Sequence, residues 1–343
     1  MSVIDAQMSE DMRAAPAAVE RQEEALAGVL PVLIERLRRK PPQVVVTCAR
    51  GSSAHAATFG KHLIERYLGI VVAAAAPNIA TIYHQRLRLS DQFLLAISQS
   101  GESNDIIEQA VAARSCGAVT ACITNSPESQ LAQACEFVLP MAAGPEHSIP
   151  ATKTFVASLS ALARLAALWA QDAALAGALR SLPDRLAAAG ALDWGCLLEV
   201  LADAESLVTI GRGPTLAIAR EAALKLKEAS DIHAEAFSAA EFRHGPIALV
   251  SPRYPVLMFA PTDAAAAGMT ALAADLTAKG AAVFVTSSQE STLNRLPALP
   301  SHHPETDAIC LIQSFYAMVV RLAARRGKNA DRPRHLHKIT RTR

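Results

Sequence analysis

The sequence has few aromatic residues and almost no net charge. Phe, Trp and Tyr make up 4% of the 343 residues, and 33 basic residues stand against 32 acidic ones, so that the net charge is +1. A protein with this balance has no field over its whole surface that would recruit nucleic acid or an acidic membrane. We therefore expect no nucleic-acid partner and no membrane partner, and any anionic ligand has to be held by local groups.

The chain also lacks paired cysteines and long uninterrupted apolar runs. Its six cysteines are scattered with no Cys-x-x-Cys pair, which is typical of buried reduced thiols. The longest apolar helix, expected over 155–170, contains Arg164 and two serines and is too short for a membrane span. The N-terminus carries acidic residues and no apolar core, which argues against a signal peptide. These features predict a soluble, cytoplasmic protein.

Fingerprints of bound cofactors and metals are missing as well. The sequence contains no Gly-x-x-x-x-Gly-Lys loop and no dinucleotide-binding glycine pattern. The pairs His302-His303 and Glu146-His147 have no partners at metal-ligand spacing. We expect no metal and no organic cofactor.

What the sequence does contain is a regular alternation of short apolar runs and helical stretches. Strands are expected at 43–48, 70–74, 93–97, 119–123, 137–141, 207–210, 256–259 and 282–286. This alternation predicts parallel, doubly wound sheets. The pair Arg50-Gly51 recurs as Arg212-Gly213 after a second apolar strand, which indicates an internal duplication. The predicted fold class is α/β, with two tandem doubly wound parallel-sheet domains.

The domain bounds follow from the same pattern. We expect a helical segment over 1–40, a first domain over 41–190, a second domain over 191–326 and an irregular basic tail over 327–343. Helices of the second half are expected over 215–229, 264–279 and 306–326.

A hydroxyl-rich turn follows the apolar run at 93–97. Its sequence is Ser98-Gln99-Ser100-Gly101-Glu102-Ser103, and a helical stretch comes directly after it. Hydroxyls and the free amides of a helix N-terminus suit a phosphate, although an ordinary serine-capped helix would need one of these serines alone. A second such turn, 49–53, also falls at the carboxyl end of a strand, where parallel sheets bind ligands, and this favours phosphate binding.

Candidate acid and base groups concentrate between Glu221 and Gly245. Lys225 and Glu228 lie three residues apart and share a helix face. A carboxylate beside an ammonium suits proton transfer next to a carbonyl. An isolated Lys-x-x-Glu is nevertheless more often a solvated surface pair. Spacing alone does not choose between His233 and His244 as a further participant.

Five motifs in one order resemble the isomerase half of glutamine-dependent glucosamine-6-phosphate synthase and its relatives in the SIS (sugar isomerase) family, whose domains are flavodoxin-like. The resemblance covers nearly the whole chain after residue 40. The motifs are Ser98-Gln99-Ser100-Gly101-Glu102-Ser103, Ala151-Thr152-Lys153-Thr154-Phe155, Ala223-Leu224-Lys225-Leu226-Lys227-Glu228, His233-Ala234-Glu235-Ala236-Phe237 and Glu241-Phe242-Arg243-His244-Gly245-Pro246.

The resemblance implies a role for each matching residue. Glu228 is expected to be the base that moves a proton between C1 and C2, with Lys225 beside it. His244 is expected to open the sugar ring in the neighbouring subunit's site, which implies a homodimer. Lys338, in the tail, is expected to close over the open-chain sugar. The expected contacts to the sugar phosphate are Ser53, Ser98, Gln99, Ser100, Ser103, Ile149 and Ala151.

Departures from the family pattern bear on the reaction. Arg50 and Ala151 replace the usual Cys and Ser, and Ser2 follows Met1 where the synthase has a nucleophilic cysteine. We therefore expect no glutaminase, and a resemblance to glucosamine-6-phosphate deaminases built on this fold. The expected reaction converts glucosamine 6-phosphate to fructose 6-phosphate and ammonia through an enolamine. A fructosamine-6-phosphate deglycase, an aldose–ketose phosphosugar isomerase and a non-catalytic sugar-phosphate regulator are the alternatives.

Overall fold

The computed structural model describes residues 6–289 and 294–338, which form two compact units. The first-sheet unit comprises Ala17–Glu146, Lys153–Leu179 and the end of the tail from Leu336. The second-sheet unit comprises the chain up to Pro16, His147–Thr152 and Arg180–His335. Each unit contains one parallel five-stranded sheet.

The first-sheet unit has the strand order β2-β1-β3-β4-β5. Its strands are β1 (Val44–Ala49), β2 (Val71–Ala74), β3 (Phe93–Ile97), β4 (Val119–Thr124) and β5 (Phe137–Pro140). Its helices are α3 (Val29–Arg39), α4 (Gly51–Leu68), α5 (Asn78–Thr81), α6 (Asn104–Ser115), α7 (Gln130–Ala134), α8 (Lys153–Ala170) and, up to Leu179, α9 (Ala173–Arg180). Every residue of the central strand β3 is buried, as expected of a strand covered on both faces.

The second-sheet unit has the strand order β10-β9-β8-β6-β7. Its strands are β6 (Ser206–Gly211), β7 (His233–Ser238), β8 (Pro255–Phe259), β9 (Ala282–Ser287) and β10 (Asn294–Pro297). Its helices are α1 (Gln7–Arg13), α10 (Leu182–Gly190), α11 (Cys196–Leu201), α12 (Thr215–Ser230), α13 (Ala239–Phe242), the 3-10 helix η2 (Pro246–Leu249), α14 (Ala266–Ala278) and α15 (Pro304–Arg325). The helix α2 (Ala15–Ala27) includes the change from one unit to the other.

The two sheets share one topology. Numbered within its own unit, each has the order 2-1-3-4-5, so that β6 corresponds to β1, β8 to β3 and β9 to β4. This is the flavodoxin-like doubly wound order. The predicted fold class, with its internal duplication, is confirmed.

Two strands are absent from the sequence prediction, and both lie at an edge of the second sheet. β7 has the sequence His-Ala-Glu-Ala-Phe-Ser, and β10 is four residues long and ends in Pro297. Edge strands bury less side-chain surface than central ones, so their sequences carry less of the apolar, β-branched signal. The other eight strands lie within two residues of the predicted bounds.

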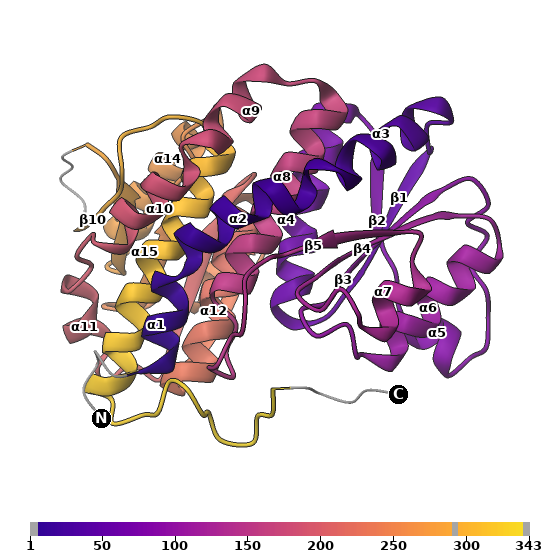
Figure 1. Ribbon diagram of the computed structural model, residues 1–343. Helices are drawn as coiled ribbons and strands as arrows, with labels where there is room; N and C mark the ends of the chain where they lie inside the picture. Colours follow the sequence, from indigo (N-terminus) through magenta and orange to yellow (C-terminus); the bar gives the residue numbers. More distant parts are fainter. Residues whose placement is uncertain (1–5, 290–293, 339–343) are drawn as a thin grey trace. The chain divides into compact units, whose positions relative to one another are not determined.

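The longest helix, α15, is the core helix of the second-sheet unit. Its length and composition would allow it to cross a membrane, but 83% of its most apolar window is buried inside the protein. It packs against α1, α10, α11 and α12, and α1 lies alongside it in Figure 1. Core helices of soluble proteins have this composition, so the apolar run is explained by packing.

All six cysteines are free thiols, and four of them are buried as predicted. Cys116 is half-buried, and Cys196 is exposed, so the prediction of burial is wrong at Cys196. Cys196 lies at the first position of the short helix α11, where its side chain is not on the face that Leu197 and Leu201 bury.

Candidate active site

The hydroxyl-rich turn between β3 and α6 is held by its own serines. The Ser98 hydroxyl accepts a hydrogen bond from the amide of Gly101 at 3.1 Å, and the Ser100 hydroxyl accepts one from the amide of Glu102 at 3.3 Å. Gly101 has φ +67°, and a Cβ there would lie 2.0 Å from Ser129 Oγ. The turn therefore requires glycine at this position.

Ser103 is the residue before the first turn of α6, but its hydroxyl makes no capping hydrogen bond. The ordinary role of a serine at this position, which would satisfy a free amide of the helix, is not filled here. Ser103 and the preceding Gln99 and Ser100 are half-buried at the carboxyl end of β3. The turn thus places a hydroxyl without a capping role at the N-terminus of a helix, which is an arrangement that can bind an anion.

The second hydroxyl-rich turn is joined to the first by an ion pair. Arg50, before α4, donates from Nε and Nη2 to Asp105 Oδ2 at 3.0 and 2.7 Å. The Asp105 side chain is fully buried, while that of Arg50 is 49% exposed. Gly51, with φ +54°, lets the chain enter α4, whose first turn contains half-buried Ser53. Sequence reasoning missed Asp105, whose signal is an acidic residue in the first turn of the helix after the serines.

Burial keeps the neighbouring thiol neutral. It raises the pKa of Cys48 to about 12, with a further increase from the Asp105 carboxylate and an opposing effect from Arg50. Cys48 is a buried core residue of β1, and a raised pKa of this kind is typical of a structural thiol.

The Lys225–Glu228 pair on α12 joins a buried ammonium to a half-buried carboxylate. The Lys225 side chain is 1% exposed; its ammonium contacts the Glu228 carboxylate and lies 3.5 Å from Glu221 Oε1. The Tyr316 hydroxyl of α15 donates to Glu221 Oε1 at 3.3 Å. The alternative of a solvated surface pair is therefore wrong for Lys225. Glu221 and Tyr316 were not predicted, although the i, i+4 spacing of Glu221 and Lys225 was visible in the sequence.

This arrangement gives Glu228 a distinct chemical environment. Its side chain is 19% exposed, whereas that of Glu221 is fully buried. The ammonium between them holds one oxygen of Glu228 and leaves the carboxylate partly open to solvent. A carboxylate held in this way can accept and return a proton, and the adjacent cation can stabilise negative charge on a reacting oxygen.

His244 is placed apart from this pair. It is exposed in the turn after α13, and its amide donates to Glu241 O at 2.9 Å. Among the described residues of this unit, no hydrogen bond or ion pair joins His244 to Lys225 or Glu228. His233, on the edge strand β7, is exposed as well.

The tail is anchored in both units, each time on an acidic residue that was not predicted. In the second-sheet unit Asp231 accepts from Lys328 and Arg334, each at 2.7 Å, and the pKa of Asp231 is lowered, chiefly by the Lys328 hydrogen bond. In the first-sheet unit Lys338 Nζ lies 3.4 Å from Glu146 Oε2. The described tail contains no helix or strand, as predicted.

Ile149 and Ala151 lie half-buried in the segment His147–Thr152, which belongs to the second-sheet unit. The segment is fixed from both ends of the chain. Asp11 Oδ2 accepts from the amides of His147 and Ser148, and the Ile149 amide donates to Asp331 O at 2.9 Å. Asp331 in turn accepts from the amides at the start of α1. Neither aspartate was singled out from the sequence.

Metal-ligating side chains do not gather in the described part of the chain. Within residues 6–289 and 294–338, no three His, Cys, Asp or Glu side chains are placed so that they could hold a metal ion.

Comparison with known proteins identifies the family. The SIS domain model matches residues 40–168 and 200–326. Glutamine–fructose-6-phosphate aminotransferase (isomerizing) of Symbiobacterium thermophilum is 35% identical over 86% of this chain and 51% of its own length. The chain thus spans about half the length of the curated relatives it matches.

Solved structures extend the comparison. A protein of Silicibacter pomeroyi, provisionally described as a phosphosugar isomerase, is 41% identical with a TM-score of 0.91, covering 95% of this chain and 100% of that one. Glucosamine-6-phosphate deaminase of Thermotoga maritima shares the fold at 21% identity and a TM-score of 0.73, covering 97% and 99%. The chain therefore belongs to the SIS domain family.

Proposed function

We propose that this protein converts glucosamine 6-phosphate to fructose 6-phosphate and ammonia. The observation that carries the proposal is the buried Lys225 ammonium against the partly open carboxylate of Glu228. Burying a cation beside a carboxylate costs desolvation free energy, so stability alone does not explain the pair. Proton transfer at a carbon next to a carbonyl would explain it. The deaminase that shares this fold supports the choice of reaction within the family.

In this proposal the turn between β3 and α6 binds the phosphate. The helix amides and the hydroxyls of Ser98, Ser100 and Ser103 supply the donors, while Ser53 and Gln99 contact the phosphate or sugar. Ile149 and Ala151 contact the sugar chain. These donors are neutral, so binding depends on the number and direction of hydrogen bonds more than on net charge.

The proposed chemistry starts with ring opening by His244, which gives an aldehyde at C1. Glu228 removes the proton from C2, and the C2–H electron pair forms the enolamine double bond between C1 and C2. Lys225 stabilises the developing charge on oxygen. Glu228 then returns the proton to C1 while the C2–N double bond forms, and a proton from the nitrogen passes to the C1 oxygen, which becomes a hydroxyl. Water hydrolyses the resulting imine at C2 to the ketone and ammonia. Lys338 closes over the open-chain form.

We further propose that the protein works as a cytoplasmic homodimer in which each subunit's His244 serves its neighbour. The exposure of His244, with the 50% exposed Leu249 five residues on, supports a role at a surface that a second copy covers. Two inactive variants test this point. If Glu228→Gln and His244→Ala proteins are mixed and allowed to exchange subunits, half of the dimers carry one intact site, so that about a quarter of wild-type activity returns. No recovery after demonstrated exchange contradicts the shared site.

The direct test is ammonia release from purified protein given glucosamine 6-phosphate, with fructose 6-phosphate followed in the same tube. Equal yields of both products are expected. Glu228→Gln should lower kcat by about 100- to 10,000-fold, the usual contribution of a general base, while phosphosugar binding is retained. Glu199→Gln, an exposed carboxylate on α11, is the matched control and should leave kcat unchanged. Normal turnover by Glu228→Gln would refute the assignment of the base.

A second candidate function rests on Arg50. Its guanidinium is half exposed beside the phosphate-binding turn and is fixed in direction by Asp105. Such a group suits a substrate with a carboxylate on its nitrogen substituent, as in an amino-acid adduct of fructosamine 6-phosphate. Release of a free amino acid from that adduct, with no ammonia from glucosamine 6-phosphate, would favour the deglycase.

A further inference from the structure

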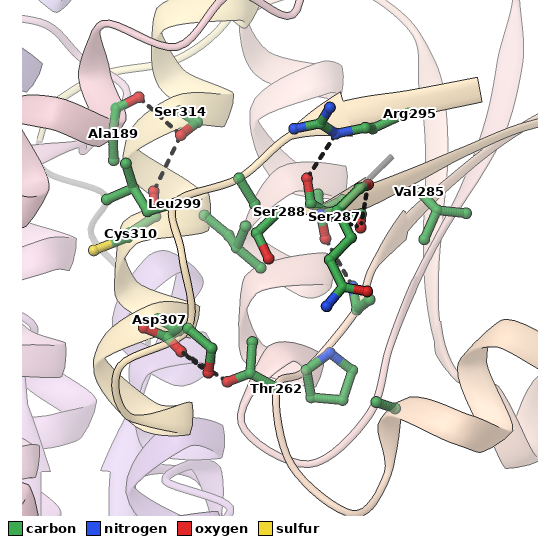
Figure 2. Close-up of a pocket in the computed structure, with 18 of the residues that line it drawn as sticks. Ala189, Thr262, Val285, Ser287, Ser288, Arg295, Leu299, Asp307, Cys310 and Ser314 are labelled. Atoms are coloured by element: carbon green, nitrogen blue, oxygen red, sulfur yellow. Dashed lines mark hydrogen bonds between the residues drawn. The ribbon is translucent and has the colours of Figure 1, made fainter. Parts of the chain in front are cut away.

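A cavity of about 360 Å³ lies inside the second-sheet unit. Among the described residues, neither Lys225 nor Glu228 lines it. Residues at and after the carboxyl ends of β8 and β9 form one side of it, including Thr262, Ser287 and Ser288. Figure 2 shows Asp307, Cys310 and Ser314 of α15 along the facing wall. Its volume is within the range of roughly 300–1,000 Å³ that is usual for small-molecule sites.

The position of the cavity in the second sheet corresponds to a position in the first sheet. Because β8 and β9 correspond to β3 and β4, the segments that line it correspond to the segments after β3 and β4 in the first-sheet unit. There the segment after β3 is the hydroxyl-rich turn at Ser98–Ser103. Ligands of doubly wound sheets bind at the carboxyl ends of the strands. The second domain therefore has a hollow at the place where its duplicate is expected to bind phosphate.

The one acidic side chain among the lining residues is already neutralised. Asp307 accepts from Arg185 Nη2 at 2.8 Å, from Thr262 Oγ1 at 2.8 Å and from Ser301 Oγ at 3.3 Å. The amide of His302 donates to both of its oxygens. Four separate donors leave this carboxylate with no unmet charge, so that it does not repel an anion strongly.

The two basic side chains of the cavity retain unused donors. Arg185 Nε is buried and, within residues 6–289 and 294–338, makes no hydrogen bond to an oxygen or nitrogen, although the Cys310 thiol interacts with this guanidinium. Arg295 donates from Nε to Ser287 O at 3.0 Å, and no acidic partner of Arg295 is found among residues 6–289 and 294–338. A buried guanidinium nitrogen that lacks a strong acceptor is costly, and an anion that entered the cavity would supply that acceptor, with half-buried Arg295 as a second cation.

The remaining lining complements a sugar. The hydroxyls of Thr262, Ser287, Ser288 and Ser301 lie beside small apolar surfaces such as Ala260 and Leu299. Thr262 and Ser301 donate to Asp307, and Ser287 donates to Gln289 O, so these three hydroxyls can offer acceptor oxygens to the hydroxyl groups of a monosaccharide. The apolar surfaces match its C–H groups. An inorganic anion alone would use the arginines but none of this surface.

We propose that this cavity is a second binding site, for a phosphorylated monosaccharide whose phosphate is held by Arg185 and Arg295. The site is separate from the proposed catalytic groups. It does not depend on which reaction the protein catalyses, because the lining alone defines it.

The test is calorimetric titration of fructose 6-phosphate into full-length Glu228→Gln protein, whose turnover is expected to be too slow to disturb the titration. One binding event should weaken at least tenfold in Arg295→Ala and be lost in Ser288→Trp, which fills the mouth of the cavity without removing a charge. Arg325→Ala, an exposed arginine at the end of α15, is the matched control and should change nothing. The proposal would be overturned if Arg295→Ala and Ser288→Trp both left every binding event unchanged.

Two simpler probes test the sugar and the anion separately. Inorganic phosphate and fructose should each bind the cavity at least tenfold more weakly than fructose 6-phosphate. If phosphate alone binds as tightly, the site is an anion site, and the proposal of a sugar ligand is wrong. A protein that releases no ammonia but loses one binding event in Arg295→Ala would contradict the proposed reaction and uphold the second site, so the two failures are distinguishable.

Discussion

Replacing Lys225 by methionine should destabilise the second-sheet unit severely. The substitution keeps the length of the side chain but removes the ammonium that lies 3.5 Å from Glu221, whose side chain is fully buried. Breaking a buried ion pair by removing one partner costs about 3–5 kcal/mol, because the other charge is left uncompensated. With a Tm shift of about 2–4 °C per kcal/mol, typical of domains of 150–250 residues, the midpoint should fall by about 6–20 °C.

The origin of this loss can be isolated with a second substitution. Glu221→Gln removes the negative charge that Lys225 pairs with and retains an oxygen that can accept from the Tyr316 hydroxyl. In the Lys225→Met background it should therefore restore about 1–3 kcal/mol, as expected for coupled neighbours in a double-mutant cycle. In the wild-type background the same change should destabilise, because Lys225 then loses its ion pair with the Glu221 carboxylate.

The two tryptophans allow each unit to be observed separately. Trp194 is buried in the second-sheet unit and Trp169 in the first-sheet unit. In a Trp169→Phe background, urea unfolding followed by fluorescence reports the second-sheet unit alone. Lys227→Met, on the exposed side of the same helix, is the control and should cost less than about 1 kcal/mol. The reasoning would be refuted if Lys225→Met cost no more free energy of unfolding than the Lys227→Met control. It would also be refuted if adding Glu221→Gln to Lys225→Met restored no stability.

Two further predictions concern the first turn and the tail. Gly101→Ala should destabilise the first-sheet unit by about 2 kcal/mol or more, because φ is +67° and the new Cβ would lie 2.0 Å from Ser129 Oγ. Gly28→Ala, where nothing lies within 4 Å, should be neutral or stabilising in the same thermal-unfolding measurement. Because the pKa of Asp231 is lowered from its usual 3.8, its pairs with Lys328 and Arg334 should stabilise the protein above that pH and lose this effect as pH falls below it. The difference in unfolding free energy between wild type and Asp231→Asn should accordingly be constant near neutral pH and shrink in acid; a difference that grows in acid would contradict the assignment. Asparagine is chosen because it tolerates the left-handed backbone of Asp231.

Local sequence pattern was sufficient for the central part of each sheet. β3 was predicted with its bounds because every residue of Phe93–Ile97 is apolar and polar residues follow at once. A strand that is buried on both faces consists of consecutive apolar residues, so it can be predicted without knowing its contacts to distant parts of the chain. The edge strands β7 and β10 did not have this signal, and pairing with one neighbour was enough to form them.

The sequence by itself thus determined the doubly wound fold, the duplication and the position of the hydroxyl-rich turns, because these depend on periodicity and on residues close together in the chain. Only the tertiary structure decided which charges are buried and which partners they have. Arg50 meets Asp105 across 55 residues, Tyr316 meets Glu221 across 95, and Asp331 holds Met8 across 323. Burial of Lys225 depends on α15 packing against α12, and no pattern within α12 reports that contact. Hydrogen bonds and desolvation act between groups that packing brings together, so their effects become predictable once the packing is known.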